Sequence, residues 1–342
     1  MLTPANPAAE PSPLATAVKT SRTDSGTPAA KARRRGMHLL DEQDYRFVLA
    51  GFHSLLPLVA DTEPHLRGVI EDALTHPGSM VRAQLAYAIM RSYRVDSIRA
   101  RSAAVAIEYF HTASLIFDDL PAMDNAVERR GRACPHVAYG EAAAQLGGLA
   151  LINQAYALLW EVLDTLPLRQ RRRVSDLVTR SLGVQGVLNG QSRDLHFSQS
   201  AGRASDVLAV AEGKTVPLIR LTLVLPALIG GADAAALGHL DRLSELWGLS
   251  YQIMDDFKDC LMTDQEAGKS TARDAELGRP NLPSATGIEG AGQRLLELMA
   301  EARREVDQFQ AGTDLRSLLD NLQGILDQER ARVEARIPVA AA

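Results

Sequence analysis

Two aspartate-rich runs carry most of the chemistry that this sequence could perform. Each run contains three acids and the second begins 137 residues after the first: Asp118, Asp119 and Asp124, then Asp255, Asp256 and Asp259. Carboxylates beside an apolar stretch repel one another and resist burial unless a cation compensates them. Mg²⁺ prefers such hard oxygen ligands, and it usually takes one or two carboxylates plus phosphate oxygens of a substrate. The two runs therefore predict acidic faces that hold a diphosphate between them through shared Mg²⁺ ions.

Helices are the elements expected to position these acids. Asp255 and Asp259 have the four-residue spacing that places two side chains on one helix face. Pro121 disfavours a regular helix through the first run, so Asp124 is expected to reach back from a bend. From about residue 38, Ala, Leu, Arg and Glu dominate and strand-like alternation is scarce. We predict an all-α fold in which the two acidic helices face each other across one bundle, where helical folds place metal sites.

Length and composition limit the possible classes of protein. The 342 residues suffice for one large helical domain or two ordinary ones, and 46% apolar residues allow a large core. A net charge of −5 is too close to balance to favour a nucleic acid partner. The two cysteines, Cys134 and Cys260, cannot form a disulfide framework, which favours a reducing cytoplasm. We expect no membrane span, because no uninterrupted apolar run approaches the required length.

The first 36 residues differ from the rest of the chain. They are rich in Ala, Pro, Ser and Thr, have no apolar period, and end in the basic stretch 31–35. Such a composition predicts a disordered tail at 1–36. A secretory signal would need an apolar segment after the basic one, whereas an organelle transit peptide remains an alternative because acids are few.

Basic residues near the acidic runs suggest phosphate binding. Arg129 and Arg130 follow the first run, and an arginine presents a planar fork of donors that suits phosphate oxygens. A charge run is more often a solvated face, but the position beside an acidic run favours the functional interpretation. Lys214 and Lys269 each follow a glycine and could also bind phosphate. Neither follows a strand or has phosphate-loop spacing, so a nucleotide site is not predicted.

Together these segments resemble the trans-isoprenyl diphosphate synthase family (polyprenyl synthetases), of the geranylgeranyl diphosphate synthase type. The resemblance covers about residues 60–285. It rests on six elements in the family's order: the first acidic run with residues 111–125, Arg129-Arg130-Gly131, Gly190-Gln191 to Asp194-Leu195, Lys214-Thr215, the second acidic run with residues 251–259, and Gly268-Lys269 with the segment up to Asn281.

The resemblance implies a single-domain helical bundle around a deep central cavity, here residues 38–335, and a homodimer. It implies that an allylic diphosphate, held by several Mg²⁺ ions, ionises and is attacked by isopentenyl diphosphate. Motif matching assigns all six acids to the metals and gives Asp118, Asp119, Lys214, Thr215 and Gln252 catalytic roles. The substrate-binding residues that it implies are Arg82, Arg129, Arg130, Gln191, Lys214 and Lys269.

One departure from the family pattern concerns the second substrate. The family places a lysine where this chain has Ser79, although Arg82 is retained. A lost charge-assisted contact is worth on the order of 1.5–3 kcal/mol, or roughly ten- to a hundredfold in affinity. The chain could therefore be an elongating synthase with a rearranged pocket, which we favour. Alternatives are a class I terpene synthase that ionises an allylic diphosphate without isopentenyl diphosphate, or a non-catalytic partner subunit.

Two residues before the first run bear on product length. Ala113 is small where the family's farnesyl-producing members often carry an aromatic residue, so a growing chain could pass it. Phe110 lies about one turn further and could form a floor, although it could equally be an ordinary core residue. This pattern predicts geranylgeranyl diphosphate, a C20 product.

Overall fold

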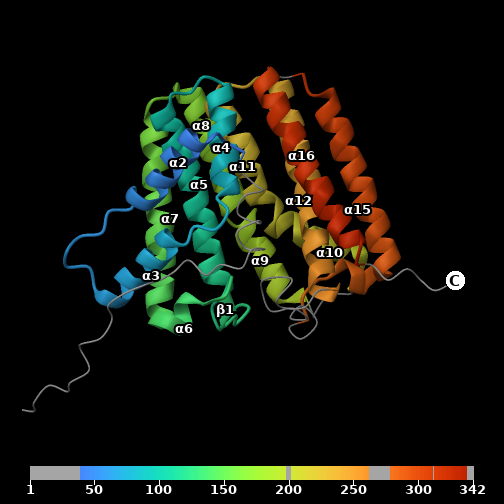
Figure 1. The fold of residues 1–342 in the computed structure, drawn as a ribbon, viewed down its shortest axis with the longest axis horizontal. Coiled ribbons are helices and arrows are strands. Elements are labelled where there is room, and N and C mark those ends of the chain that lie inside the picture. Colours follow the sequence, from blue (N-terminus) through green and yellow to red (C-terminus); the bar gives the residue numbers. More distant parts are fainter. Residues whose placement is uncertain (1–38, 198–201, 262–277, 311, 337–342) are drawn as a thin grey trace, which may run out of the picture. The chain divides into compact units, whose positions relative to one another are not determined.

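The computed structural model describes residues 39–197, 202–261, 278–310 and 312–336. The predicted tail at 1–36 and Lys269 lie outside these ranges. The described chain is built from helices, with one two-stranded hairpin of two-residue strands (Figure 1). Its elements are α2 (Glu42–Ser54), α3 (Pro64–Thr75), α4 (Val81–Ser92), α5 (Ser97–Asp118), β1 (Glu128–Arg129), β2 (Arg132–Ala133), α6 (Pro135–Tyr139), α7 (Glu141–Asp164), α8 (Leu168–Leu182), α9 (Val187–Leu195), α10 (Ala204–Lys214), α11 (Val216–Ile229), α12 (Ala234–Leu261), α15 (Leu282–Gln308) and α16 (Thr313–Glu334). The prediction of an all-α fold is confirmed.

α5 is the central helix of the bundle and packs along α7. Twelve of its 22 residues are buried, and the Asp96 side chain caps its N-terminus by accepting hydrogen bonds from two backbone N–H groups. Two contacts show that the helices run antiparallel. Phe117 lies against Gly148, where a β-carbon would be 2.9 Å from the ring, and Phe110 contacts Tyr156 with ring centroids 5.0 Å apart. α5 thereby delivers Asp118 to one end of the bundle.

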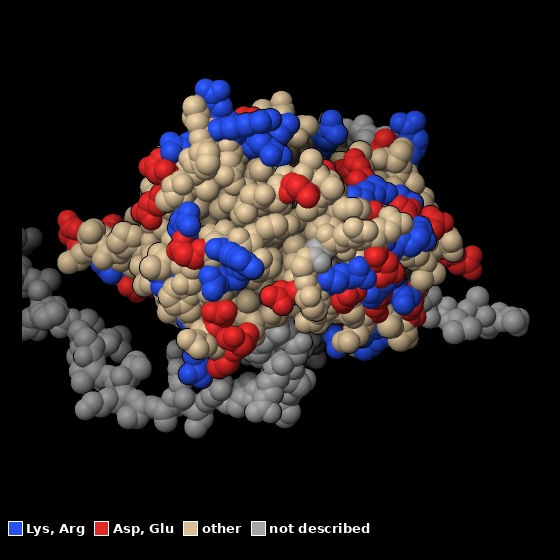
Figure 2. All heavy atoms as spheres, turned by 90° about the horizontal axis from the view of Figure 1, so that it is seen from above, with Lys and Arg blue, Asp and Glu red and all other residues tan. Residues whose placement is uncertain are grey.

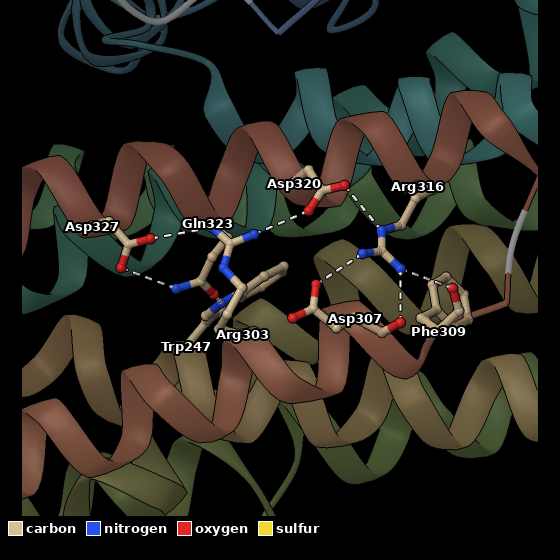
Figure 3. A network of polar contacts seen from close by, with 8 residues as sticks. All are labelled: Trp247, Arg303, Asp307, Phe309, Arg316, Asp320, Gln323 and Asp327. Atoms are coloured by element: carbon tan, nitrogen blue, oxygen red, sulfur yellow. Dashed lines mark hydrogen bonds and ion pairs between the residues drawn. The ribbon is translucent and has the colours of Figure 1, made fainter.

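A polar network ties the C-terminal helices α15 and α16 to α12 (Figure 3). Trp247 donates to Gln323 over 2.7 Å, and Gln323 donates to Asp327 over 3.3 Å. Arg303 of α15 spans two acids of α16, Asp320 and Asp327. Because Trp247 and Gln323 are buried, their hydrogen bond satisfies groups that would otherwise be costly to bury. The network fixes α12, which carries the second acidic run.

The surface shows mixed charge rather than one sign. In Figure 2, Lys and Arg are interspersed with Asp and Glu on the side where Figure 1 places α15 and α16. Ion pairs within α16, such as Arg316–Asp320 and Arg330–Glu334, are part-buried. Ion pairs near the surface contribute little stability individually.

α7 has two properties that bear on the expectation of no membrane span. Its residues Glu141–Asp164 are long and apolar enough to cross a membrane, by length and composition alone. The helix also packs against α3, α5 and α6, as a core helix of a globular protein does. Its outward face keeps large apolar side chains exposed, with Leu146 at 53%, Leu149 at 54% and Trp160 at 64%.

Candidate active site

The first acidic run lies where α5 ends. The helix stops at Asp118, and the backbone N–H of Asp124 donates to the Asp118 carbonyl over 2.9 Å. Asn125 completes the reversal with a φ of +49°, in the left-handed region that non-glycine residues rarely adopt. The chain therefore bends back after Pro121 as the sequence predicts, and the three acids of the run lie within one compact turn.

Arg129 forms a hydrogen-bonded ion pair with Asp119 of the first run. Its guanidinium makes three hydrogen bonds of 2.7–3.0 Å to the two carboxylate oxygens, and Asp119 is 2% exposed. Burial alone would lower the pKa of Arg129. The negative charges of Asp119 and Asp118 have a larger, opposite effect, so the pKa of Arg129 is raised. Such a bidentate pair is rigid. It fixes Arg129, on strand β1, at the end of α5.

A second set of ion pairs joins helices that are distant in sequence. Lys214 Nζ lies 2.7 Å from Asp194 Oδ2. Arg279 donates to Asp124 Oδ1 over 2.9 Å, and its Nη1 is 3.9 Å from Asp194 Oδ2. Although burial opposes it, the pKa of Lys214 is raised by Asp194, Asp118 and Asp124. The first acidic run, α9, the end of α10 and the segment before α15 therefore meet at one point.

Two glycines allow α9 and α10 to approach closely enough for this meeting. A β-carbon on Gly190 would lie 2.1 Å from the carbonyl carbon of Gly213, so only glycine fits there. Gly190 is one turn from Asp194 on α9, and Gly213 directly precedes Lys214. The glycine of the Gly-Gln element thus sets the Asp194–Lys214 contact. Gln191, next to it, is part-buried and points its Nε2 at Met123 Sδ, 4.0 Å away, beside the first run.

The second acidic run lies in the last turns of α12 and is connected to the first through Lys214 and Thr215. Thr215 donates to Gln252 over 2.7 Å, and Gln252 donates to Asp256 Oδ1 over 2.9 Å. Asp256 is 1% exposed and also accepts from the backbone N–H of Leu282 over 2.9 Å. Asp259 is buried and Asp255 is half-buried. Lys214 interacts with Asp118 and Asp124 of the first run, and the adjacent Thr215 is linked to Asp256 of the second run through Gln252, so both runs flank the same point.

Asp118 is an acid whose negative charge is disfavoured by burial and by the acids around it. Burial is the largest cause that raises its pKa to about 6, and the charges of Asp124 and Asp194 raise it further against the opposing effect of Lys214. A divalent cation would remove that penalty. Among the described residues no three acid, histidine or cysteine side chains are already gathered around one metal position. The two runs nonetheless supply hard carboxylate oxygens on both sides of Lys214 and Thr215, and the chemistry of these donors fits Mg²⁺.

A cationic cluster lies next to the first run. His111, on α5, interacts with Arg82, Arg129 and Arg130, and burial first, then these charges, hold the His111 pKa well below its usual range. Glu108, one turn earlier, accepts from the backbone N–H of Ala83 over 2.9 Å. Burial raises the Glu108 pKa, against the opposing effect of Arg82. His111 Nδ1 and Arg82 Nε are buried and make no hydrogen bond within the described part of the chain, as expected of groups aimed at a ligand.

Sequence reasoning did not identify Glu108, and it placed Asp194 and Arg279 in family-like segments without giving either a role in the site. Glu108 is a lone acid between Ala103–Ile107 and Tyr109-Phe110, and an acid inside an apolar helix is the signal that could have identified it. No local pattern brings Arg279 to Asp124, because 155 residues separate them.

The two chain-length residues lie on the α7 side of α5. Ala113 is fully buried and Phe110 is 5% exposed. Phe110 meets Tyr156 in a T-shaped contact with an interplanar angle of 75°, and Tyr156 in turn lies 6.3 Å from Trp160. An aromatic row therefore runs from α5 to the outer face of α7.

Comparisons with known proteins agree with this geometry. The family model described as polyprenyl synthetase matches residues 63–315. A chloroplastic geranylgeranyl pyrophosphate synthase of Capsicum annuum is 32% identical over 72% of this chain and 68% of its own length. The farnesyl diphosphate synthase of Geobacillus stearothermophilus is 31% identical over 70% of this chain and 82% of its own.

Solved structures give the same result. A geranyltransferase from Helicobacter pylori, solved with magnesium and isoprenyl diphosphate, superposes with a TM-score of 0.75 at 25% identity, covering 84% of this chain and 96% of that one. An FPP/GFPP synthase from Zymomonas mobilis gives 0.69 at 26% identity, covering 85% and 99%. The convergence of both acidic runs, Lys214-Thr215 and the neighbouring arginines is thus found in a chain that belongs to the polyprenyl synthetase family and is a prenyltransferase of the geranylgeranyl/farnesyl diphosphate synthase kind.

Proposed function

We propose that this protein condenses isopentenyl diphosphate with an allylic diphosphate, in a Mg²⁺-dependent reaction, to make a short all-trans prenyl diphosphate. One observation carries the proposal. Lys214 pairs with Asp194 beside the first acidic run, while the adjacent Thr215 is joined through Gln252 to the second. Two acidic runs flanking a lysine suit a diphosphate whose charge is shared among metals and a cation.

The metal ligands in this proposal are the six acids of the two runs: Asp118, Asp119, Asp124, Asp255, Asp256 and Asp259. When bound, Mg²⁺ would neutralise the charge that develops on the leaving pyrophosphate. Lys214, Arg129 and Lys269 would hold the allylic diphosphate. Arg129 has a donor left for a phosphate because Asp119 uses only its Nε and Nη2.

The cationic cluster would bind isopentenyl diphosphate through Arg82 and Arg130. Support comes from the neutral His111 and from the buried, unpaired Arg82 Nε, both of which lack a partner that an incoming diphosphate could provide. These retained cations favour the elongating reaction over a terpene synthase. Ser79, at the family's lysine position, is the observation that keeps the terpene synthase as a second candidate.

The reaction would begin when the allylic C–O bond breaks and its electron pair leaves with pyrophosphate. The isopentenyl double bond then attacks the allylic cation, and a proton is lost to pyrophosphate. Thr215 donates a hydrogen bond to Gln252, and Gln252 donates one to Asp256, which supports a role for both residues in a fixed orientation beside the carbon atoms that react. Gln191 would line the same end. Apolar side chains along α5 would keep water from the cation.

The proposed product is the C20 geranylgeranyl diphosphate. The small side chain of Ala113 would let the tail pass, and Phe110, in contact with Tyr156, would stop it. Phe110 is eight residues before Asp118, so the stop lies about 12 Å from the reacting end at 1.5 Å per helical residue.

A homodimer in the cytoplasm is part of the proposal. The apolar outer face of α7, with Leu146, Leu149 and Trp160 each more than half exposed, is the surface that we assign to a second copy. Replacing Leu146 and Leu149 with Glu should yield monomers in sedimentation experiments. A wild-type protein that is already monomeric at micromolar concentration would remove this part of the proposal.

One experiment tests the activity. The purified protein is incubated with Mg²⁺ and farnesyl diphosphate, with and without isopentenyl diphosphate, and products are identified by mass. A prenyl diphosphate formed only with both substrates supports elongation. A hydrocarbon or alcohol formed from the allylic substrate alone supports the terpene synthase instead.

A further inference from the structure

A four-residue segment at the start of α15, Arg279–Leu282, contacts both acidic runs. Arg279 donates through Nη2 to the Met123 carbonyl over 3.0 Å and to Asp124 Oδ1 over 2.9 Å. At its other end, Leu282 donates its backbone N–H to Asp256 Oδ2 over 2.9 Å. We call this segment the strap. It ties the turn after α5 to the last turns of α12.

The Arg279 side chain is nearly enclosed in this position. It is 7% exposed, and Asp194 lies 3.9 Å from Nη1 on its other side. Its Nε is buried and makes no hydrogen bond within the described part of the chain. An enclosed guanidinium whose Nε has no acceptor can be satisfied by an anion that joins the carboxylates already there.

Arg279 and a metal ion bound to Asp124 would share one carboxylate. Asp124 Oδ1 accepts from Nη2, and a cation bound to that oxygen would stand next to a fixed positive charge. A diphosphate changes the balance, because its oxygens can accept from the guanidinium and can ligate Mg²⁺ as well.

We infer that Arg279 is a positioning residue that acts through Asp124: it competes with Mg²⁺ for this carboxylate, so that the metal binds well only together with a diphosphate. The inference rests on the proposed function, since it takes Asp124 as a metal ligand. Its consequence is a positive coupling between Mg²⁺ and diphosphate, which by linkage must be equal in both directions. The strap extends the effect to the second run, because the same segment holds Asp256.

The test is a calorimetric titration of Mg²⁺ into the full-length protein, alone and with inorganic pyrophosphate. Arg279→Gln should tighten the binding of Mg²⁺ alone by roughly tenfold, the size of one charge-assisted contact. It should also reduce the enhancement that pyrophosphate gives. Arg279→Lys, which keeps the charge but not the fork, should fall between the wild type and Arg279→Gln. Unchanged or weaker binding of Mg²⁺ alone in Arg279→Gln would overturn the inference.

Two controls separate competition from a general charge effect. Arg303→Gln removes an arginine from α15 whose partners are Asp320 and Asp327, and it should leave Mg²⁺ affinity unchanged. In an Asp124→Asn background, Arg279→Gln should lose most of its effect, because the contested carboxylate is gone. A full tenfold effect in that background contradicts the inference.

The titration also distinguishes a wrong proposed function from a wrong inference about Arg279. If the wild type binds no Mg²⁺ even with pyrophosphate, the metal–diphosphate site itself is wrong. If it binds both and Arg279→Gln changes neither, only the competition is wrong. Thermal melts of each variant check that it is folded before titration.

Discussion

The guanidinium of Arg130 lies directly against the α-carbon of Gly78: a β-carbon there would be 2.1 Å from Nη1. Gly78 has a φ of +72°, and Arg130 itself has a φ of +56°, so both backbones adopt conformations that cost energy for other side chains. Arg130 therefore lies against Gly78, next to Ser79, the position at which the family resemblance led us to expect a lysine. The strained backbone is consistent with a functional position for this arginine.

Gly78→Ala should displace Arg130. The flexible end of the arginine will move sooner than the backbone, and we expect KM for isopentenyl diphosphate to rise about tenfold, since a charge-assisted contact is worth about 1.5–3 kcal/mol. Steady-state kinetics with each substrate varied in turn measures this. Gly231→Ala is the matched control, because Gly231 has a φ of +82° with nothing within 4 Å. It should cost similar stability without changing KM, and an equal KM effect in both variants would contradict the assignment.

Ser79→Lys should restore the missing cation. We expect affinity for isopentenyl diphosphate to increase roughly ten- to a hundredfold, with the allylic substrate unaffected. Thr179→Lys, on the exposed face of α8, adds the same charge far from the site and should change neither. If Ser79→Lys leaves the affinity for isopentenyl diphosphate unchanged, either Arg130 already supplies the cation expected at position 79, or isopentenyl diphosphate binds elsewhere.

Asp118→Asn should stabilise the protein in the absence of metal while it impairs catalysis. The folded-state pKa is raised from 3.8 to about 6, so between these values the native state binds more protons than the unfolded state. Stability from this group therefore falls as pH rises through that window, and the full penalty is present at pH 7.5. Allowing for the partial exposure of the side chain, the gain should be about 1–2 kcal/mol.

Thermal melts with a chelator at pH 7.5 and at pH 4 check this sign. Asp118→Asn should melt higher than the wild type at pH 7.5, and the difference should vanish at pH 4. Exposed Asp61→Asn should show no such pattern. Activity of Asp118→Asn should fall by about a hundredfold or more, as for other groups that stabilise a leaving-group charge. Equal melting at both pH values would mean that Asp118 carries no such penalty.

Phe110→Ala should lengthen the products, because it removes the aromatic floor that Tyr156 supports. The change also costs about 3–5 kcal/mol of stability, so Phe110→Leu is the milder companion. Phe52→Leu is the control. Phe52 is fully buried on the other side of α5, against Tyr109 at 5.1 Å, and its loss should destabilise without altering product length. Mass analysis showing the same products from Phe110→Ala as from the wild type removes Phe110 from the product-length proposal.

The helical fold and the bend at Pro121 were predictable because local rules govern them. Helix-forming residues dominate the chain, and a proline inside a run of acids interrupts the helix regardless of what packs against it. The pairing of Asp119 with Arg129 was not predicted, although both residues had been selected, because spacing alone does not show which cation neutralises which acid. Glu108 had a local signal, an acid inside an apolar helix, but its contact with Ala83 and the contact of Arg279 with Asp124 depend on packing between segments far apart in the sequence, which no local pattern encodes. The metal-binding roles given to all six acids of the two runs, and the substrate-binding and catalytic roles given to the neighbouring residues, remain predictions.

The crossing of α9 and α10 at Gly190 and Gly213 is a position at which this enzyme does not tolerate substitution. Backbone contact at that crossing leaves no space for even a methyl group, so the relative placement of Asp194 and Lys214 is insensitive to substitutions made elsewhere. The α5–α7 boundary, by contrast, is filled by side chains that can be exchanged. Libraries that diversify Ala113, Phe110 and Tyr156 should therefore yield catalysts with new product profiles, whereas libraries at the glycine crossing should yield mostly inactive protein.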